Sequence, residues 1–492
     1  MSYFFNKFSD IRFRLVPDAR EAVLNYKKLI SDLLTAFGAQ GVSFICSVVT
    51  TLLVPKILGV EEFAYWQLFV FYTSYVSFFQ LGLNDGIYLQ HGGESRDAID
   101  KSLIRSEFNV GASYQLVAAL IIAGYGLFCE SGDRVFVILA SSSYLLLSNL
   151  SFYISFVFQA MNETKIASYS TIVNRGIYLI LLLLCIGLRI EDFEVYVFFY
   201  LAAQAITLSY LLWKARDFAR AGSLGFRQSA RETLRSMKLG VVLTIANVSA
   251  QLIMGMSRIV IDHVWGLAAF GQVSLSLSIV NFALVFVSQA AMVLFPAMRS
   301  VGREKMRIHY IRLRDCLGAI LPVAMLLYAP LRILVGLWLP QYEDALTYLA
   351  FLFPVCLFEI QTNLTVVTFI KVRCEPRVLL VINVLAVLCT LAAQVMAILV
   401  FDTPVASVLA SLFGVSMRYA IGTIYLGSVY ENRNPKMMAC MFAESIAFMA
   451  ITTFVSVLWG YIFCVGMLAV HFALCRSELN ALLGELRRVS FQ

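Results

Sequence analysis

The chain has 492 residues, of which 60% are hydrophobic and only 14% are charged. An ordinary soluble domain carries roughly 25% charged residues, and a mean hydropathy of +0.80 leaves too little polar surface for a water-soluble particle of this size. The composition therefore excludes a soluble globular protein. It also excludes a transmembrane β-barrel, whose strands would be short alternating segments rather than long apolar runs.

The cysteines, histidines and net charge indicate neither a metal site nor a nucleic acid partner. No CxxC pair occurs among the ten cysteines, most of which lie inside apolar runs, and the four histidines are scattered singly. Buried free cysteines behave as small hydrophobic residues. The net charge of +7 does not by itself indicate nucleic acid binding, because what matters is where along the chain the basic residues lie. We predict no metal, no cofactor and no nucleic acid binding.

Apolar runs of the length that crosses a bilayer, about 20 residues, follow one another along the chain. Turn-forming or charged segments such as "CESGDR" and "ENRNPK" separate them, and a short break near Gly460 divides the last two. The sequence predicts an all-α polytopic membrane protein with about 14 transmembrane helices. The predicted spans are 31–55, 63–89, 107–129, 134–159, 166–188, 193–213, 238–260, 268–297, 311–330, 344–370, 377–401, 405–428, 436–457 and 459–475.

Basic residues are distributed unevenly between the two sides of the predicted membrane. The termini and the loops after even-numbered spans hold 31 of the 38 Lys and Arg residues, whereas the loops after odd-numbered spans hold four. Loops rich in Lys and Arg stay on the cytoplasmic side. The pattern predicts that both termini are cytoplasmic, that residues 1–30 form a cytoplasmic arm, and that "LLVPKILGVEEFAYW" at 52–66 is an outer hairpin.

A short internal repeat accompanies this hairpin. The segment "LGVEEFAYWQ" at 58–67 aligns with "WGLAAFGQVS" at 265–274, with a constant offset of 207 residues that matches Gly59 to Gly266. Both copies lie between the first and second spans of a six-span block. The repeat predicts two parallel halves, which in transporters enclose a cavity.

The predicted organisation is therefore two six-helix lobes related by a pseudo-two-fold axis along the membrane normal, followed by two extra helices. The N-lobe covers 31–213, a basic cytoplasmic linker covers 214–237, and the C-lobe covers 238–428. Residues 429–492 hold the last two spans and a cytoplasmic tail.

Polar residues recur at helical spacing on the first, second, seventh and eighth spans. Because polar groups facing lipid are expensive, four such stripes predict a shared hydrated cavity. The alternative is that Ser and Thr side chains only allow the helices to pack closely. The stripes are Gln40, Ser43, Ser47 and Thr51; Thr73, Ser77, Gln80 and Asn84; Thr244, Asn247, Gln251 and Arg258; and Ser274, Ser278, Asn281 and Ser288.

Three arginines, Arg175, Arg258 and Arg418, lie inside predicted spans. An arginine there costs at least about 2.5–3.5 kcal/mol on insertion scales, so each needs a reason. One reason is an anion site, since guanidinium binds phosphate oxygens two at a time. The other is an internal ion pair, and Asp262, four residues after Arg258, is a candidate partner.

Two carboxylates in predicted spans, Asp85 and Glu359, are candidates for binding a coupling proton or sodium ion, because burial permits protonation near neutral pH. The alternative is that each one pairs with an arginine. The sequence does not decide between the two.

The outer hairpin carries a family resemblance. Residues Pro55 to Ala64 have the form P-x-x-L-G-x-x-x-[FY]-[GA], and the next span ends in "LGL" at 81–83. This pattern resembles the polysaccharide-unit flippases of the multidrug/oligosaccharidyl-lipid/polysaccharide exporter superfamily. The chain departs from related lipid flippases in one respect, since its first span has no arginine and its only cation there is Lys56 at the outer mouth.

The resemblance implies a V-shaped, two-lobed fold lined by spans 1, 2, 7 and 8. It implies translocation of an undecaprenyl-pyrophosphate-linked sugar unit across the bacterial inner (cytoplasmic) membrane, for O-antigen, capsule or exopolysaccharide synthesis. Its partners would be the lipid-linked glycan, membrane lipids and other polysaccharide-assembly proteins. The implied mechanism is alternating access, in which the two halves move about the cavity. The hairpin fits this mechanism, because Pro55 permits a bend there and Gly59 permits a tight turn.

Two other functions remain open. A cation-coupled multidrug exporter of the same superfamily would need a cavity dominated by carboxylates, whereas the stripes here are neutral apart from Arg258. A membrane polysaccharide polymerase or glycosyltransferase would need acidic metal ligands or a large outer loop. No DxD, HExxH, GxxxxGK[ST] or GxSxG motif occurs, so we predict that the protein is not an enzyme.

Overall fold

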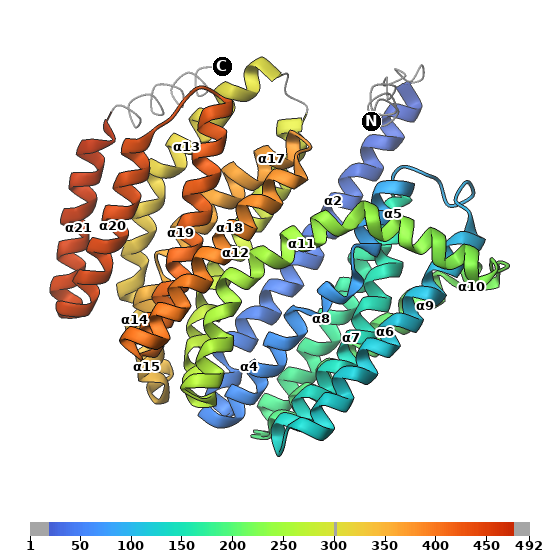
Figure 1. The fold of residues 1–492 in the computed structure, drawn as a ribbon, viewed down its shortest axis with the longest axis horizontal. Coiled ribbons are helices and arrows are strands. Elements are labelled where there is room, and N and C mark those ends of the chain that lie inside the picture. Colours follow the sequence, from blue (N-terminus) through green and yellow to red (C-terminus); the bar gives the residue numbers. More distant parts are fainter. Residues whose placement is uncertain (1–18, 300–302, 477–492) are drawn as a thin grey trace.

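The computed structural model describes residues 19–299 and 303–476, and within these ranges every regular element is a helix (Figure 1). Residues 1–18 of the predicted arm, residues 477–492 of the predicted tail and the side chain of Ser288 lie outside the described part.

Twelve of the described helices are long and apolar enough to cross a membrane. The two remaining predicted spans are also present as helices, the second in pieces and the eighth as α12, whose apolar part is Leu267–Phe282. The prediction of an all-α polytopic fold with about 14 transmembrane helices is therefore confirmed.

The helices form a first block, a second block and a C-terminal pair. The first block contains α2 (Ala19–Leu52), α3 (Val54–Ile57), α4 (Val60–Ser74), η1 (Val76–Gln80), α5 (Leu83–His91), α6 (Lys101–Cys129), α7 (Asp133–Ala160), α8 (Thr164–Gly187) and α9 (Phe193–Lys214), and α10 (Arg216–Arg220) follows it. The second block contains α11 (Phe226–Val264), α12 (Leu267–Arg299), α13 (Arg303–Ile320), η2 (Leu321–Leu327), α14 (Tyr328–Trp338), η3 (Pro340–Tyr342), α15 (Glu343–Leu352), α16 (Val355–Gln361), η4 (Thr362–Val367), α17 (Thr368–Val372), α18 (Pro376–Met396), η5 (Ala397–Phe401) and α19 (Pro404–Val429). The pair is α20 (Pro435–Phe454) and α21 (Val457–Leu474).

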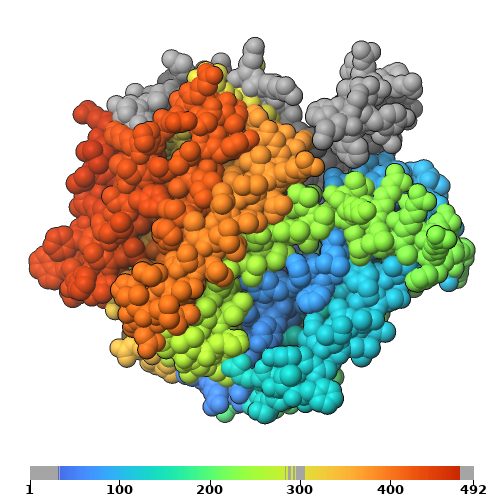
Figure 2. Space-filling view, in the orientation of Figure 1, coloured from blue at the N-terminus to red at the C-terminus, as the bar shows by residue number. Residues whose placement is uncertain are grey.

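Helix α2 begins and α21 ends at the same end of the molecule, which we call the terminal end (Figure 1, top). The connections from α3 to α4 and from α11 to α12 lie at the opposite end, the hairpin end. Helix α11 packs against α5 and α6 of the first block and against α18 and α19 of the second. Figure 2 shows it as a green band crossing one face between the two blocks.

The second predicted span is not one continuous helix. After α4 comes the 3-10 segment η1, and the chain then passes through Leu81 with φ of +50° before α5 begins. The break frees backbone carbonyl groups, which need partners inside a membrane protein. Side-chain amides supply them. Asn149 Nδ2 donates to the Val76 carbonyl at 3.0 Å, and Gln115 Nε2 donates to the Phe79 carbonyl at 2.7 Å.

Gln80 and Asn84, which the sequence predicts in a cavity, instead complete this amide network. Asn84 Nδ2 donates to Gln80 Oε1 at 2.6 Å, and Gln80 Nε2 donates to Asn149 Oδ1 at 2.9 Å. Asn149 also donates to Gln115 Oε1 at 2.9 Å. These polar side chains of the second span hold a broken helix together inside the first block.

A second break separates α2 from α3 beside Pro55, as the bend predicted there requires. The second block supplies partners for the freed carbonyls. Trp338 Nε1 donates to the Leu52 carbonyl at 2.8 Å, and Gln341 Nε2 donates to the Pro55 carbonyl at 3.3 Å. The Lys56 ammonium lies 3.2 Å from the centroid of the Trp338 ring. The two blocks are therefore joined at the hairpin end.

Gly59 and Gly266, the matched glycines of the repeat, stand directly before α4 and α12. Only Gly266 needs to be glycine, because its φ is +89°, a conformation that other residues rarely adopt. Gly59 has φ of −60° and open space where a Cβ would lie. The tight-turn role predicted for Gly59 is therefore wrong, although its place in the repeat agrees with the structure.

The last two spans divide earlier than the sequence predicts. Helix α20 ends at Phe454, α21 begins at Val457, and Ser456 stands in extended conformation at the N-terminus of α21. Gly460, the predicted break, lies inside α21 with Ile451 Cγ2 3.6 Å from its Cβ position. The predicted break at Gly460 is therefore wrong, and the residue faces α20 at an ordinary contact distance.

Helices α5 and α11 cross with their backbones in contact. A Cβ atom on Gly86 would lie 1.8 Å from the Ser236 carbonyl oxygen, and one on Gly240 would lie 2.1 Å from the Gly82 carbonyl oxygen. Two small residues four positions apart stand on each side of the contact, Gly82 and Gly86 at the start of α5 and Ser236 and Gly240 in α11. This arrangement lets helices approach closely in membranes. We call this contact the glycine crossing.

Replacing Gly86 with alanine should destabilise the protein by about 1–3 kcal/mol or more, because the added methyl group meets backbone that cannot move aside. Gly124→Ala in α6 is the matched control, since nothing lies within 4 Å of its Cβ position, and it should leave stability unchanged or slightly raised. Thermal unfolding in lipid nanodiscs compares the two. Equal melting temperatures for the two variants would contradict the close crossing.

Candidate functional site

A cavity of about 430 Å³ lies between the blocks, towards the hairpin end. Its walls come from α4, η1, α6 and α7 on one side and from α11 and α12 on the other. Its volume falls in the range of about 300–1,000 Å³ that is usual for small-molecule sites. We call it the interblock cavity.

Aromatic side chains form much of its surface. Phe71 and Tyr75 of the broken second span face α11 and α12, where Phe71 lies edge-on to Phe270 with 5.8 Å between ring centroids. The Tyr75 hydroxyl donates to the Gln251 carbonyl at 3.2 Å. A Cβ on Gly255 would lie 1.7 Å from that hydroxyl oxygen. Gly255 therefore allows Tyr75 to lie directly on α11.

Arg258 on α11 is the predicted site residue that lines this cavity. Its guanidinium carbon lies 4.9 Å from the centroid of the Phe71 ring, within the distance of a cation–π contact. Its Nε atom is buried without a hydrogen-bond partner. Within the described residues Arg258 forms no ion pair with any carboxylate. Arg258 therefore brings to the cavity wall a positive charge that no carboxylate contacts directly.

Asp262, the predicted local partner of Arg258, is bound by another residue. Arg134 at the start of α7 donates from Nη1 to Asp262 Oδ2 at 2.9 Å and from Nη2 to Oδ1 at 2.5 Å. The Asp262 side chain is 3% exposed and that of Arg134 is 28% exposed. The predicted pairing of Arg258 with Asp262 is wrong, because the two-pronged contact from Arg134 occupies both carboxylate oxygens.

The importance of Arg134 is not visible in the sequence, where it is one of four basic residues in the outer loops. One signal could have found it. Asp262 stands at the outer end of the seventh span, where a buried carboxylate needs a cation, and Arg134 ends a loop on the same predicted side. The pair joins the first block to the second along the cavity wall.

Arg418 does not line the interblock cavity. Inside the second block its Nη1 donates to both carboxylate oxygens of Glu359 at 3.1 and 3.2 Å, and its Nε donates to Asn383 Oδ1 at 2.9 Å. Asn363 Nδ2 also donates to Glu359, at 3.0 Å. The structure thus forms the internal ion pair that was the alternative interpretation for both Arg418 and Glu359.

Arg175 lies in an aromatic cluster of the first block. Its Nη1 lies 3.5 Å from the Tyr200 hydroxyl, and its guanidinium carbon is 5.9 Å from the Tyr200 ring centroid. Tyr144 and Tyr178 contact the same ring. Arg175 is not among the residues that line the interblock cavity.

Asp85 lies beside the glycine crossing and joins α5 to α11. Thr244 Oγ1 donates to Asp85 Oδ2 at 3.0 Å, so the hydroxyl that the sequence assigns to the cavity stripe binds a carboxylate of the first block. Within the described residues Asp85 has no ion pair shorter than 4.0 Å. The ion pair with an arginine, which was the alternative interpretation for Asp85, is therefore not formed.

The other stripe residues whose side chains the structure describes are not part of the wall of the interblock cavity. Asn247, Gln251 and Asn281 are exposed on α11 and α12. The four residues of the first span are partly exposed on α2, where the hydroxyls of Ser43 and Ser47 donate to carbonyls one turn earlier. Those four residues are Gln40, Ser43, Ser47 and Thr51.

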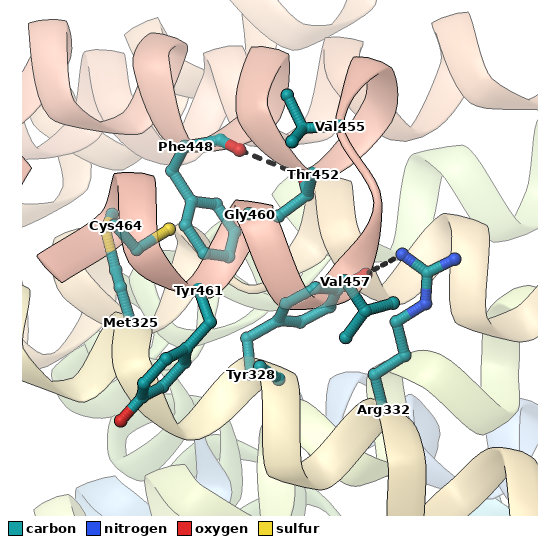
Figure 3. Close-up of a pocket in the computed structure, with 11 residues that line it drawn as sticks. Met325, Tyr328, Arg332, Phe448, Thr452, Val455, Val457, Gly460, Tyr461 and Cys464 are labelled. Carbon is teal, nitrogen blue, oxygen red and sulfur yellow. Dashed lines mark hydrogen bonds between the residues drawn. The ribbon is translucent and has the colours of Figure 1, made fainter.

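A second, much smaller cavity lies between α14 and the C-terminal pair α20 and α21 (Figure 3). Its volume is about 20 Å³, which is room for roughly one water molecule. Arg332 reaches into it and donates to the Tyr328 hydroxyl at 3.4 Å. This cavity is too small to hold a transported solute in the conformation seen here.

Comparison with known proteins agrees with this architecture. Residues 29–301, just over half of the chain, match the family described as polysaccharide biosynthesis protein. The chain belongs to this family, as the hairpin motif indicated. Among curated proteins, none matches the sequence.

Solved structures share the fold at low identity. The lipid II flippase MurJ in an inward closed conformation is 13% identical with a TM-score of 0.63, over 92% of this chain and 99% of that chain. An inward-facing MATE multidrug transporter of the MOP superfamily is 13% identical with a TM-score of 0.62, over 79% and 94%. A MOP superfamily transporter from Pyrococcus furiosus is 14% identical with a TM-score of 0.53, over 90% and 96%. The fold is that of the MOP superfamily transporters.

Replacing Arg134 with glutamine should destabilise the protein by roughly 3 kcal/mol, because the buried Asp262 carboxylate loses its cation. The double variant Arg134→Leu with Asp262→Leu should recover most of that loss, since both charges are removed together. Thermal unfolding in nanodiscs measures both variants. If the double variant is as unstable as the single one, the ion pair is not what holds α7 against α11.

Proposed function

We propose that this protein is a flippase that moves a lipid-linked saccharide with an anionic phosphate headgroup across the bacterial inner membrane. The observation that carries the proposal is Arg258, a cation without an acidic partner that faces an aromatic cavity between the two blocks. Membership of the polysaccharide biosynthesis protein family supports it. The proposed cargo is an undecaprenyl-pyrophosphate-linked repeat unit for O-antigen, capsule or exopolysaccharide.

The cavity has the two kinds of surface that such a headgroup needs. A guanidinium group binds phosphate oxygens through paired, charge-assisted hydrogen bonds, and the unpartnered Nε of Arg258 is a donor available for that purpose. Flat aromatic faces such as Phe71 and Tyr75 give apolar contact area to the carbon–hydrogen faces of sugar rings. The lipid tail would remain in the bilayer outside.

The multidrug-exporter alternative fits the cavity less well. A hydrophobic cation needs a free carboxylate, but Asp262 in the cavity wall is neutralised by Arg134. Glu130, a partly exposed residue that also lines the cavity, accepts a hydrogen bond from the Tyr125 hydroxyl at 3.3 Å and keeps its charge. Arg258, whose Nε is buried without a hydrogen-bond partner, places a positive charge in the same wall, and this charge opposes the binding of a cation.

In the proposed cycle the two blocks move relative to each other about the cavity. The Arg134–Asp262 ion pair and the hydrogen bond from Trp338 to the Leu52 carbonyl close the hairpin end in this conformation, so both must break before cargo leaves there. The distribution of basic residues supports a cytoplasmic terminal end. Release at the hairpin end would then deliver the saccharide to the outer leaflet.

Replacing Arg258 with alanine should lower the rate of translocation of a pyrophosphate-linked saccharide by about tenfold or more, since a charged hydrogen bond contributes roughly 1.5–3 kcal/mol. Arg258→Lys should retain part of the rate because the charge remains. Fluorescent-headgroup accessibility in proteoliposomes measures the rate.

Arg332→Ala is the matched control. It removes an arginine of similar burial from the small cavity of Figure 3 and should leave translocation near the wild-type rate. The role of Arg258 is contradicted if both alanine variants translocate at the wild-type rate, or if both lose the same fraction of it.

A further inference from the structure

The region behind the glycine crossing contains a buried carboxyl group that the cavity does not use. Glu107 lies two turns into α6 and is 0% exposed. Its Oε1 lies within hydrogen-bonding distance of Ser236 Oγ of α11, at 2.7 Å. Its Oε2 is buried and has no hydrogen-bond partner.

Among the basic side chains of the described residues, His91 acts on this carboxyl group, and it is a cation only when it is protonated. Within the described residues Glu107 forms no salt bridge, and neither lysine nor arginine is among the charged groups that act on it. An ionised carboxylate buried with one oxygen unpartnered is far more costly than a neutral carboxyl group. The closed packing of α5, α6 and α11 therefore favours the protonated form of Glu107.

The hydrogen bonds around Ser236 agree with a proton on Glu107. Ser236 Oγ lies 2.7 Å from Glu107 Oε1 and 3.2 Å from Gln90 Oε1, and a single hydroxyl proton cannot be donated to both oxygens. If Glu107 is protonated, its O–H donates to Ser236 Oγ, and the Ser236 hydroxyl donates to Gln90. Both contacts are then hydrogen bonds.

Ser236 also forms the glycine crossing itself. Its carbonyl oxygen is the atom that excludes a side chain at Gly86, so the residue that binds Glu107 is the residue on which α5 rests. Ionisation of Glu107 would require water or a cation to enter this contact. The proton and the closed crossing are thus linked.

The other titratable groups near Glu107 come from three elements. His91, at the end of α5, is 6% exposed, has its Nδ1 3.0 Å from Glu94 Oε2, and has a buried Nε2 without a partner. Glu232 of α11 and Tyr153 of α7 also act on Glu107. The pair of Arg96 with Asp217 of α10 stays charged, because the hydrogen bond from Arg96 lowers the pKa of Asp217 to about 2.

We propose that Glu107 is a proton-binding site that locks α11 to α5 and α6. A proton on the carboxyl group keeps the glycine crossing closed, and release of that proton, leaving the carboxylate, opens the crossing at the terminal end of the cavity. The role of this site in transport rests on the proposed function. It deepens that function by making the binding and release of a proton a step of the translocation cycle. The proton-binding step itself needs no cargo.

Hydrogen–deuterium exchange of the full chain in nanodiscs tests the site directly. After correction for the intrinsic pH dependence of amide exchange, peptides covering 83–91 and 229–244 should lose protection as pH rises from about 5.5 to about 8.5, by up to about tenfold per pH unit above the midpoint. Glu107→Gln, which mimics the protonated form, should stay protected throughout. Glu107→Asp keeps an ionisable group and should retain the pH dependence.

Two further variants separate this site from its neighbours. His91→Gln and Glu94→Gln should both keep the wild-type response. The proposal is overturned if Glu107→Gln exchanges with the wild-type pH dependence, if the wild type shows none, or if His91→Gln alone removes it. Because no saccharide is present, a failure of the flippase proposal would leave this result intact, and the two failures are distinguishable.

Discussion

The rest of the structure depends on the glycine crossing. Gly82, directly before α5, Gly86 of α5 and Gly240 of α11 bring two backbones into contact where no side chain would fit. Helix α11 continues from there into the second block. Dispersion contacts and close approach, rather than exclusion of water, drive helix association in a bilayer. Helix α11 therefore contacts both blocks, and the cavity, the Arg134–Asp262 pair and the Glu107 contact are all positioned along it.

Composition and periodicity predict the membrane class, the number of helices and the place of α4 and α12 after matched glycines. They do not predict which polar side chains are structural. Gln80 and Asn84 stand at helical spacing in a span that turns out to be broken. Asn149, which accepts a hydrogen bond from Gln80, lies 69 residues further along the chain, and Gln115 lies 36 residues after Phe79, whose carbonyl it binds. A periodic pattern cannot reveal a break whose freed carbonyls are satisfied from other helices.

The charges show the same limit. The sequence places three arginines in the membrane without saying which are compensated, because their partners come from other helices. Glu359 and Asn383 accept hydrogen bonds from Arg418. Asp262 forms its ion pair with Arg134 and not with Arg258. Charged residues inside the membrane therefore have two different roles. Paired charges hold helices together at a cost that their hydrogen bonds offset, and the unpaired Arg258 faces the interblock cavity.

The most direct test of the central claim is a structure of the protein with a pyrophosphate-linked saccharide bound in nanodiscs. The account predicts phosphate oxygens within hydrogen-bonding distance of the Arg258 guanidinium, between Phe71 and α11, with Arg418 still bound to Glu359. A headgroup bound away from the interblock cavity, with Arg258 paired to a carboxylate or turned to the lipid, would contradict it.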